Sequence, residues 1–443
     1  MNIVQITPGA GGMYCGNCFR DNALVRQLRQ MGHTALMAPL YLPLKLDEAD
    51  TSQGTPIFFS GVNVYLEQKA PFFRHAPQWL HQWLASPALL GWAARFAAKT
   101  RPEDVGDLTL SMLRGEHGNQ AREVDELVKW LQTQHEPDVI CLSNCLLAGL
   151  IRRLKAELPC PVVCMLQGED SFLDALPSNH RTAVWATLAE RLQEADLFVA
   201  PSRYFAERMR GRLGLSGEKM RVVFNGISLE GYETALETPA TPQPPVIGYF
   251  ARMCPEKGLD TLIDAFMLLK ERGTLPGLRL RVGGGCGPGD EAFVQRLRSR
   301  LSSRGYLGEV EFHPNLNRSA KLAFLKSLTV LSVPALYGEA FGLYLIEALA
   351  AGVPVVQPRH AAFPELIEAT GGGVLFEPGS PVALADALEA VLRDRPNLQQ
   401  MGQAGRDVVR DQFSVERMAT NMLDAFRSAR PSASVPAMNL QSR

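Results

Sequence analysis

Residues 1–38 read MNIVQITPGAGGMYCGNCFRDNALVRQLRQMGHTALMA. Here a short apolar run over Ile3–Thr7 leads into a glycine-rich turn, a helical pattern over Cys18–Met31 and a second apolar run over Thr34–Ala38. Short apolar strands that alternate with amphipathic helices are typical of a parallel sheet, because each crossover helix covers one face of that sheet. The opening of the chain therefore predicts an α/β fold.

The same rhythm continues to about residue 236, where a proline-rich segment interrupts it. Residues 237–245 read ETPATPQPP, with four prolines in nine positions, which is typical of an extended linker. Strand and helix patterns resume over 246–413, a last helical pattern covers 414–429, and we expect the polar tail, 430–443, to be disordered. We predict two Rossmann-like domains, 1–236 and 246–413, each with a doubly wound parallel sheet, and a ligand cleft between them.

The composition excludes several classes of protein. The 443 residues carry 45 Lys and Arg against 46 Asp and Glu, so the chain has no long-range field that would attract nucleic acid. No apolar run reaches the roughly 18 residues that span a bilayer, and the first residues lack the pattern of a secretion signal. Eight cysteines without a dense pattern are typical of reduced thiols, and the Cys15–Cys18 pair lacks the second pair that a zinc site needs. We expect a cytoplasmic protein that binds no metal.

One stretch of the first domain departs from the α/β rhythm. Between Glu67 and Glu103 there is no acidic residue, although five cations and three of the five tryptophans lie there. We interpret residues from about 67 to 117 as a helical insertion. Three roles stay open for residues 70–100: a peripheral contact with an anionic inner membrane face, a wall of an acceptor site, and packing on the first domain.

The first glycine turn, Gly9-Ala10-Gly11-Gly12, directly follows the first strand. Backbone N–H groups of such a turn can approach an anion, with the positive end of a helix dipole behind them. A dinucleotide fingerprint would need a third glycine where Tyr14 stands and an acidic residue where Met37 and the two following residues stand. The second glycine run, 283–287, is followed by Pro288 at the place of its third glycine. These departures disfavour an NAD-dependent oxidoreductase, and a plain tight turn is the alternative to anion binding.

Two cations follow the first predicted strand of the second domain. Arg252 comes just after the strand Val246–Ala251, and Lys257 opens the next helix. A guanidinium fork and an ammonium point charge at one edge of a sheet suit a diphosphate. In isolation, two cations at this spacing most often belong to a solvated surface.

A third motif adds two carboxylates. Residues 337–356 read YGEAFGLYLIEALAAGVPVV, in which Gly342 marks the entry to a helix. Glu339 is then placed on the loop before that helix, and Glu347 about one turn inside it. Ionised carboxylates accept hydrogen bonds from hydroxyl groups. The pair suits a ligand with hydroxyl-rich groups on both sides of a phosphate, such as a sugar and a ribose.

These motifs together resemble the retaining, nucleotide-sugar-dependent glycosyltransferases of glycosyltransferase family four. The resemblance covers roughly residues 190–415 and is weaker in the first domain, where Gly11-Gly12 and Gly32-His33 match. The matching segments are Pro201-Ser202, Val223–Ile227, Arg252, Lys257-Gly258, Glu339, Phe341-Gly342, Glu347-Ala348 and Gly352 with Pro354–Val356. The resemblance implies the GT-B fold, with an acceptor-side first domain, a donor-binding second domain and a final helix, 414–429, that crosses back to the first.

The resemblance also implies roles for particular residues. Arg252, Lys257 and Glu339 would be catalytic, and the donor-binding residues would be Gly11, Gly12, Phe341, Gly342, Leu343 and Glu347. The donor would be a nucleotide-diphosphate sugar acting as co-substrate, with no metal and no further cofactor. The acceptor stays unidentified, and the alternative is a catalytically silent protein that binds a sugar nucleotide or a lipid.

One departure from the family concerns the acceptor side. The family often carries a histidine near the end of a first-domain strand, where this chain reads Met165-Leu166-Gln167-Gly168-Glu169-Asp170. Gln167 can hydrogen-bond but cannot act as a base. Glu169 or Asp170 would contact the acceptor hydroxyl or, equally well, cap the segment that follows. In a retaining front-face mechanism the leaving phosphate itself can take the acceptor proton.

Overall fold

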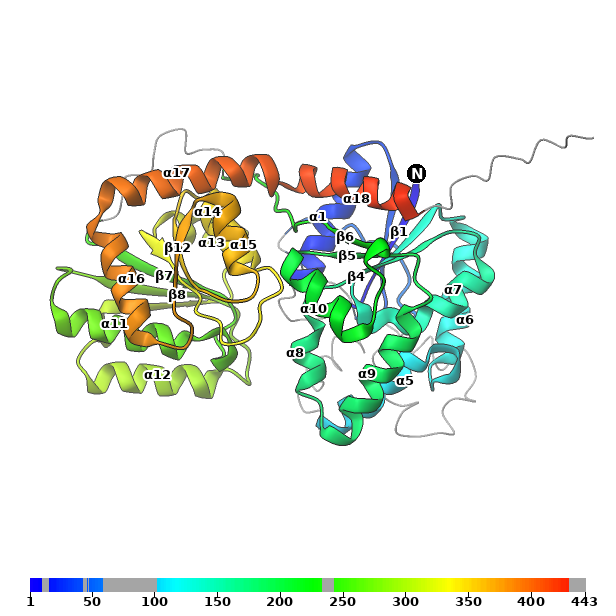
Figure 1. Cartoon of the computed structure of the whole chain (residues 1–443), viewed down its shortest axis with the longest axis horizontal. Helices are drawn as coiled ribbons and strands as arrows, with labels where there is room; N and C mark the ends of the chain where they lie inside the picture. The colour runs from blue at the N-terminus through cyan, green and yellow to red at the C-terminus, as the bar shows by residue number, and fades with distance from the viewer. Residues whose placement is uncertain (10–15, 43–45, 47, 59–101, 233–242, 430–443) are drawn as a thin grey trace, which may run out of the picture.

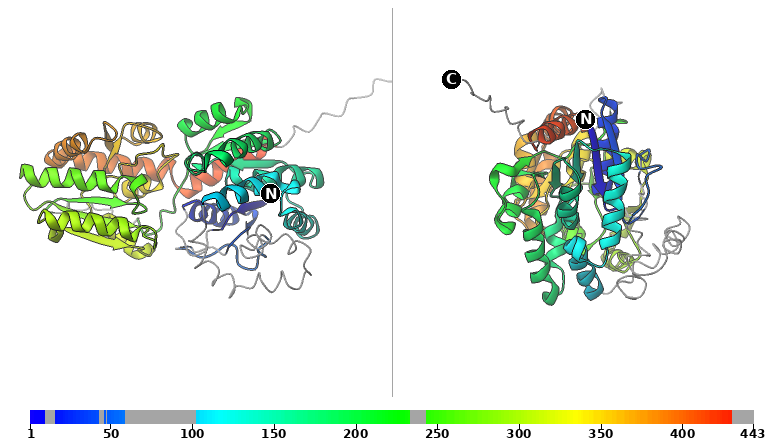
Figure 2. Two further views of the ribbon diagram at one scale, coloured as in Figure 1. Left: turned by 90° about the horizontal axis from the view of Figure 1, so that it is seen from below. Right: turned by 90° about the vertical axis from the view of Figure 1, so that its right-hand side faces the viewer.

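The computed structural model describes residues 1–9, 16–42, 46, 48–58, 102–232 and 243–429. The predictions for Gly11, Gly12 and Cys15, for the tryptophan-rich residues up to 101, for most of the proline-rich linker and for the tail 430–443 lie outside the described residues. Two lobes lie side by side, and each has its strands between helices (Figure 2).

The first lobe is built on a parallel sheet with the strand order β2-β1-β3-β4-β5-β6. Its strands are β1 Asn2–Thr7, β2 Thr34–Pro39, β3 Val139–Leu142, β4 Val162–Met165, β5 Leu197–Ala200 and β6 Met220–Val222. Its helices are α1 Gly16–Gln30, α5 Pro102–Arg114, η3 Gly115–His117, α6 Ala121–Gln134, η4 Cys145–Leu150, α7 Ile151–Glu157, α8 Glu169–Asp174, α9 Ser178–Leu192, α10 Arg203–Leu213 and η5 Gly217–Lys219. Side chains alternate between the faces: Val139 packs with α1, and Ile140 packs with α6 and α9.

The second lobe repeats this plan with the strand order β12-β11-β10-β7-β8-β9. Its strands, all parallel, are β7 Val246–Phe250, β8 Arg279–Gly284, β9 Val310–Pro314, β10 Val330–Leu331, β11 Val355–Pro358 and β12 Gly373–Phe376. Its helices are η6 Pro255–Lys257, α11 Leu259–Arg272, α12 Glu291–Ser303, η7 Leu307–Glu309, α13 Arg318–Lys326, α14 Leu343–Ala350, α15 Phe363–Thr370, α16 Pro381–Arg393 and α17 Arg395–Gln412. The predicted pair of α/β sheets is therefore confirmed.

The last described helix, α18 (Val415–Ala429), leaves the second lobe and packs on the first. Figure 1 shows α17 and α18 running one after the other across both lobes. Met418, Met422 and Phe426 of α18 are buried in the same cluster as Leu24 of α1 and Val163 of β4. Part of the hydrophobic core of the first lobe is therefore supplied by a helix that follows the second lobe in sequence.

Among the described residues, the segment that leaves the first lobe and the segment that returns to it are bonded to each other. The Ile227 N–H donates to the Phe413 carbonyl at 3.0 Å, and the Val415 N–H donates to the Ile227 carbonyl at 2.9 Å. A Cβ atom at Gly226 would lie 2.3 Å from the Ser414 carbonyl oxygen, so this close approach requires glycine. Phe224 and Phe413 stack beside it with their ring centroids 5.1 Å apart.

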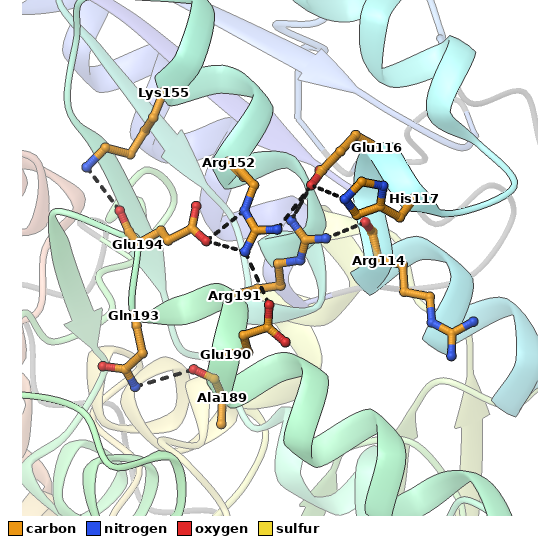
Figure 3. Close-up of polar contacts among 10 residues, drawn as sticks. All are labelled: Arg114, Glu116, His117, Arg152, Lys155, Ala189, Glu190, Arg191, Gln193 and Glu194. Carbon is orange, nitrogen blue, oxygen red and sulfur yellow. Dashed lines mark hydrogen bonds and ion pairs between the residues drawn. The ribbon is translucent and has the colours of Figure 1, made fainter.

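A group of ion pairs on the outer side of the first lobe joins residues 114–117 to α7 and α9 (Figure 3). The buried Arg191 donates to the Glu116 carboxylate at 2.8 and 3.1 Å and to the Arg114 carbonyl at 2.6 Å. Arg152 contacts Glu116 at 3.3 Å and Glu194 at 2.6 Å. Burial alone would raise the pKa of Glu116, but its hydrogen bond to Arg191 and the two guanidinium charges bring that pKa below its ordinary value.

We expect Glu116→Gln to lower the free energy of unfolding by about 1–3 kcal/mol at neutral pH, because the buried Arg191 loses its charged partner. The folded pKa of Glu116 lies below the unfolded one, so its stabilisation is present at neutral pH and is lost as pH falls through the folded pKa. Urea unfolding at several pH values measures both effects. Glu190→Gln, at a more exposed end of the same group, is the control; equal losses in the two variants would contradict the prediction.

Candidate functional site

A cavity of about 300 Å³ lies between the lobes, at the carboxyl ends of both sheets. Parallel α/β sheets commonly bind ligands at this edge. The first lobe contributes Gly16, Arg20 and Glu48, and the crossing segment contributes Gly226 and Ile227. The second lobe contributes Arg252, Lys257, Arg318, Lys321, Leu343, Tyr344 and Glu347.

Lys257 and Glu339, which are 82 residues apart in sequence, form an ion pair beside this cavity. The Lys257 Nζ atom lies 2.5 Å from the Glu339 Oε2 atom, and both side chains are largely buried. The hydroxyl groups of Tyr337 and Tyr344 lie 3.3 and 3.2 Å from the same Oε2 atom. The Glu339 carboxylate is therefore held in one place by three donors.

The surroundings of Lys257 favour its charged form. Burial alone would lower the pKa of Lys257, but the neighbouring Glu339 carboxylate raises that pKa above its ordinary value. Burial raises the pKa of Tyr344, and the Glu339 charge raises it further, so this phenol stays a neutral donor. Lys257 is the last residue of η6 and precedes α11 rather than opening it. Gly258, at φ +70°, has no room for a Cβ because the Pro334 carbonyl oxygen would lie 1.9 Å away.

Arg252 follows β7 at the cavity wall, where it is held by an acid that the sequence motifs do not include. Its Nε and Nη2 atoms donate to the Asp290 carboxylate at 2.9–3.2 Å. Asp290 in turn accepts from the Gly287 N–H in the glycine-rich loop after β8. The Arg252 side chain is 65% exposed, so its Nη1 group stays available to an anion in the cavity.

Glu347 has a partner as well. Its Oε1 atom lies 2.9 Å from the Nζ atom of Lys321 on α13, and both side chains line the cavity. Gly342, at φ +96°, begins α14 and so places Glu347 about one turn inside the helix, as predicted. The Lys321 contact uses the Oε1 atom, and the Glu347 Oε2 atom can accept from a ligand hydroxyl.

A contact from the first lobe reaches the same wall of the cavity. Glu48 accepts from Arg318 of α13 at 2.6 Å, and Arg26 of α1 lies 3.5 Å from the same carboxylate. Asn22 holds the adjoining loop, because its side chain bonds to Ala49 and Thr51. The Glu48–Arg318 ion pair therefore joins the two lobes beside the cavity.

The candidate acceptor-side residues Gln167, Glu169 and Asp170 form hydrogen bonds within the first lobe. Glu169 is buried and accepts from the Cys145 N–H at 2.9 Å and the Gln167 N–H at 2.7 Å; burial raises its pKa. Asp170 pairs with Arg208 of α10. Gln167 accepts from the Asn225 amide at 3.2 Å. Glu169 thus bonds to backbone N–H groups, and neither it nor Asp170 lies in the wall of the cavity.

The Phe341 side chain is buried away from the cavity, and its contact with a donor stays a prediction. It is 3% exposed and packs against Phe224 and Phe413 at the crossing of the two chain segments, with ring centroids 6.2–6.3 Å apart. Its side chain therefore packs behind the Glu339 loop and is not part of the cavity wall. Leu343 does line the cavity, whereas Gly11 and Gly12 lie outside the described residues.

Two family models match this chain in order. The model described as "Glycosyltransferase Family 4" matches residues 109–230, and "Glycosyl transferases group 1" matches residues 235–408. Between them they cover about two thirds of the chain, one model for each lobe. The chain belongs to the family-four glycosyltransferases.

Curated relatives of this chain agree with the family assignment. A D-inositol 3-phosphate glycosyltransferase of Jonesia denitrificans is 27% identical over 55% of this chain and 59% of its own length. A phosphatidyl-myo-inositol mannosyltransferase of Mycobacterium leprae is 31% identical over 41% of this chain and 45% of its own length. The chain thus matches less than two thirds of the length of these relatives.

Solved structures share the fold of this chain over nearly its whole length. A sucrose-phosphate synthase from Thermosynechococcus elongatus superposes with a TM-score of 0.69 at 18% identity and covers 97% of this chain and 99% of its own. Anabaena HepE, in complex with UDP, superposes with a TM-score of 0.67 at 18% identity over 97% and 100% of the two chains. The predicted GT-B fold is confirmed.

Proposed function

We propose that this chain transfers a sugar from a nucleoside diphosphate sugar to a hydroxyl group of an acceptor, with retention at the anomeric carbon. The observation that carries the proposal is the pair of buried lysine–carboxylate contacts, Lys257–Glu339 and Lys321–Glu347, at one interlobe cavity. Each carboxylate matches the hydroxyl-rich group at one end of such a donor, and the cations match the diphosphate between those groups.

The chain's own groups supply the chemistry in this proposal. The Nη1 group of Arg252 and the Lys257 ammonium stabilise the diphosphate as it leaves, and the start of α1 at Gly16 adds backbone N–H groups from the first lobe. Glu347 accepts from the ribose, and Glu339 accepts from the sugar. The leaving phosphate takes the acceptor proton, so no metal, cofactor or histidine is needed at the acceptor side.

The complexes of Anabaena HepE with UDP and with UDP-glucose favour a uridine donor for a first test. The names of the curated relatives suggest an inositol-containing acceptor. We expect one nucleotide among UDP, GDP and ADP to raise the thermal midpoint, since a ligand at 100 times its dissociation constant adds about 2.7 kcal/mol. Binding of none of the three would contradict the proposal.

A second candidate is a catalytically silent protein that binds a sugar nucleotide or lipid; the replacement of the family's histidine by Gln167 favours it. Release of free nucleotide from the matching sugar nucleotide, with and without inositol phosphate, separates the two candidates. Nucleotide binding without any release would indicate the silent protein. The proton coupling constant at the anomeric carbon of the product tests retention.

We also propose that residues 70–100 contact an anionic membrane surface, because the sequence between Glu67 and Glu103 carries five cations and no acid. In the part of the chain that the structure describes, no helix has the length and apolar character to cross a bilayer. We expect salt-sensitive binding to vesicles that contain phosphatidylserine. Lack of binding at low salt would leave acceptor binding or packing as the role of this segment. The cytoplasmic location stays a prediction.

A further inference from the structure

A side chain of the first lobe hydrogen-bonds to the loop that carries Glu339 in the second lobe. Ser202, which is fully buried, donates its Oγ hydrogen to the Ala340 carbonyl at 2.7 Å. The same Oγ accepts from the Phe205 N–H at 3.1 Å, so Ser202 also caps α10. One side chain thus begins a helix of the first lobe and holds the residue next to Glu339 in the second.

A carboxylate of the second lobe makes the reciprocal contact. Glu365 on α15 accepts from the Arg203 N–H at 2.9 and 3.1 Å and from the Tyr204 N–H at 3.2 Å. These are the first N–H groups of α10, which a helix leaves without intrahelical partners. A negative charge here also interacts favourably with the helix dipole. Glu365 therefore acts as a helix cap supplied by the opposite lobe.

These contacts close into a ring around Glu339. The Ala362 N–H, at the start of α15, donates to the Glu339 carbonyl at 3.3 Å. The path runs from Glu339 through α15 to Glu365, across to the start of α10, and back through Ser202 to Ala340. Both backbone carbonyls at and after Glu339 are thus fixed, one from its own lobe and one from the other.

Residues of the two lobes also pack closely around this ring of hydrogen bonds. A Cβ atom at Gly338 would lie 2.3 Å from the Tyr204 hydroxyl, and a Cβ atom at Gly168 would lie 3.5 Å from that of Ala340. The two lobes therefore meet directly on the Glu339 loop. A shift of α10 relative to α15 would therefore move the backbone of Glu339 and Ala340, and with it the Glu339 carboxylate.

We propose that Ser202 and Glu365 are positioning residues, which set the place of the Glu339 carboxylate by fixing the lobes at this ring. The inference rests on the proposed sugar transfer. Of the groups assigned to the nucleotide, Arg252 and Glu347 take no part in the ring, and Lys257 contacts it only through the Glu339 carboxylate. Disturbing the ring therefore lowers the rate of transfer and leaves nucleotide affinity in place, because sub-ångström misplacement affects a reacting geometry more than a bound nucleotide.

Glu365→Gln is the main test. The variant keeps the shape of the side chain, but it removes the charge and turns an NH₂ group toward the N–H donors of α10. We expect kcat to fall about 10- to 100-fold, while the dissociation constant of the nucleotide, measured by calorimetry, changes less than twofold. Glu365→Asp, which keeps the charge, should recover part of kcat. Glu368→Gln, at an exposed position of the same helix, is the matched control and should leave kcat unchanged.

Ser202→Ala gives a second line of evidence. The double variant Ser202→Ala, Glu365→Gln should lose less kcat than the product of the two single fold-losses, because both residues act on one ring. Unchanged kcat in Glu365→Gln, or a parallel weakening of nucleotide binding, would overturn the inference. If Ser202→Ala does not fold, the Glu365 variants decide alone. A wild-type protein that binds no nucleotide would instead overturn the proposed function.

Discussion

Lys257→Met is expected to lower kcat/KM for the sugar nucleotide by a factor of about 10²–10³. Methionine fills a similar volume but has no charge, so the diphosphate loses a cation at the point where its negative charge grows. The Glu339 carboxylate also loses the partner that lies 2.5 Å away and keeps only the hydroxyls of Tyr337 and Tyr344. Initial rates of nucleotide release, with the donor concentration varied, measure the change.

Lys129→Met is the control, because Lys129 is exposed on α6 of the other lobe. Circular dichroism and the thermal midpoint must show that Lys257→Met is folded, since the variant leaves a largely buried carboxylate without its ion pair. Turnover like that of the wild type in a folded Lys257→Met protein would refute the role of this residue.

Glu339→Gln should have the second largest effect, a loss of about 10²-fold in kcat/KM. The amide keeps the size of the carboxylate but accepts from a sugar hydroxyl more weakly, and it leaves the buried Lys257 charge without its partner. Because Lys257 and Glu339 are in contact, the double variant Lys257→Met, Glu339→Gln should lose less than the product of the two single losses.

Glu347→Gln separates the sugar end of the site from the ribose end. Its carboxylate contacts Lys321 rather than Lys257, so this variant should mainly raise the donor KM, whereas Glu339→Gln should mainly lower kcat. Thermal midpoints with and without nucleotide show whether each variant still binds the donor. The same change in kcat and KM for both variants would contradict the division of roles between the two carboxylates.

The alternation of strands and helices is predictable from the sequence because each buried strand is a short apolar run and each covering helix is amphipathic. β6 is not predicted: it has three residues, and two of them, Arg221 and Val222, are exposed. β10 is shorter than its apolar run, 328–333. Past Leu331, the Val333 N–H bonds to the side-chain oxygen of Gln357 at 3.3 Å and leaves the backbone ladder.

The predicted site residues stand where a motif follows a strand, as Arg252 and Lys257 do, or begins a helix, as Glu347 does. Their partners could not be predicted in the same way. Asp290, Lys321 and Arg318 belong to elements that reach the cavity only through the fold, and residues 26 to 270 positions apart in sequence form the ion pairs. For Glu169 the sequence left acceptor binding and local capping open, and in the structure its carboxylate accepts from two backbone N–H groups of the first lobe.

The position of α18 has a consequence for how the protein is made. On a translating ribosome, the strands of the first lobe emerge long before the helix that supplies Met418, Met422 and Phe426 to cover one face of them. One face of the first-lobe sheet therefore stays uncovered, and can be bound by chaperones, until the second lobe has been synthesised. An isolated fragment that stops before residue 415 should aggregate, and joining α18 to it through an artificial loop should restore its solubility.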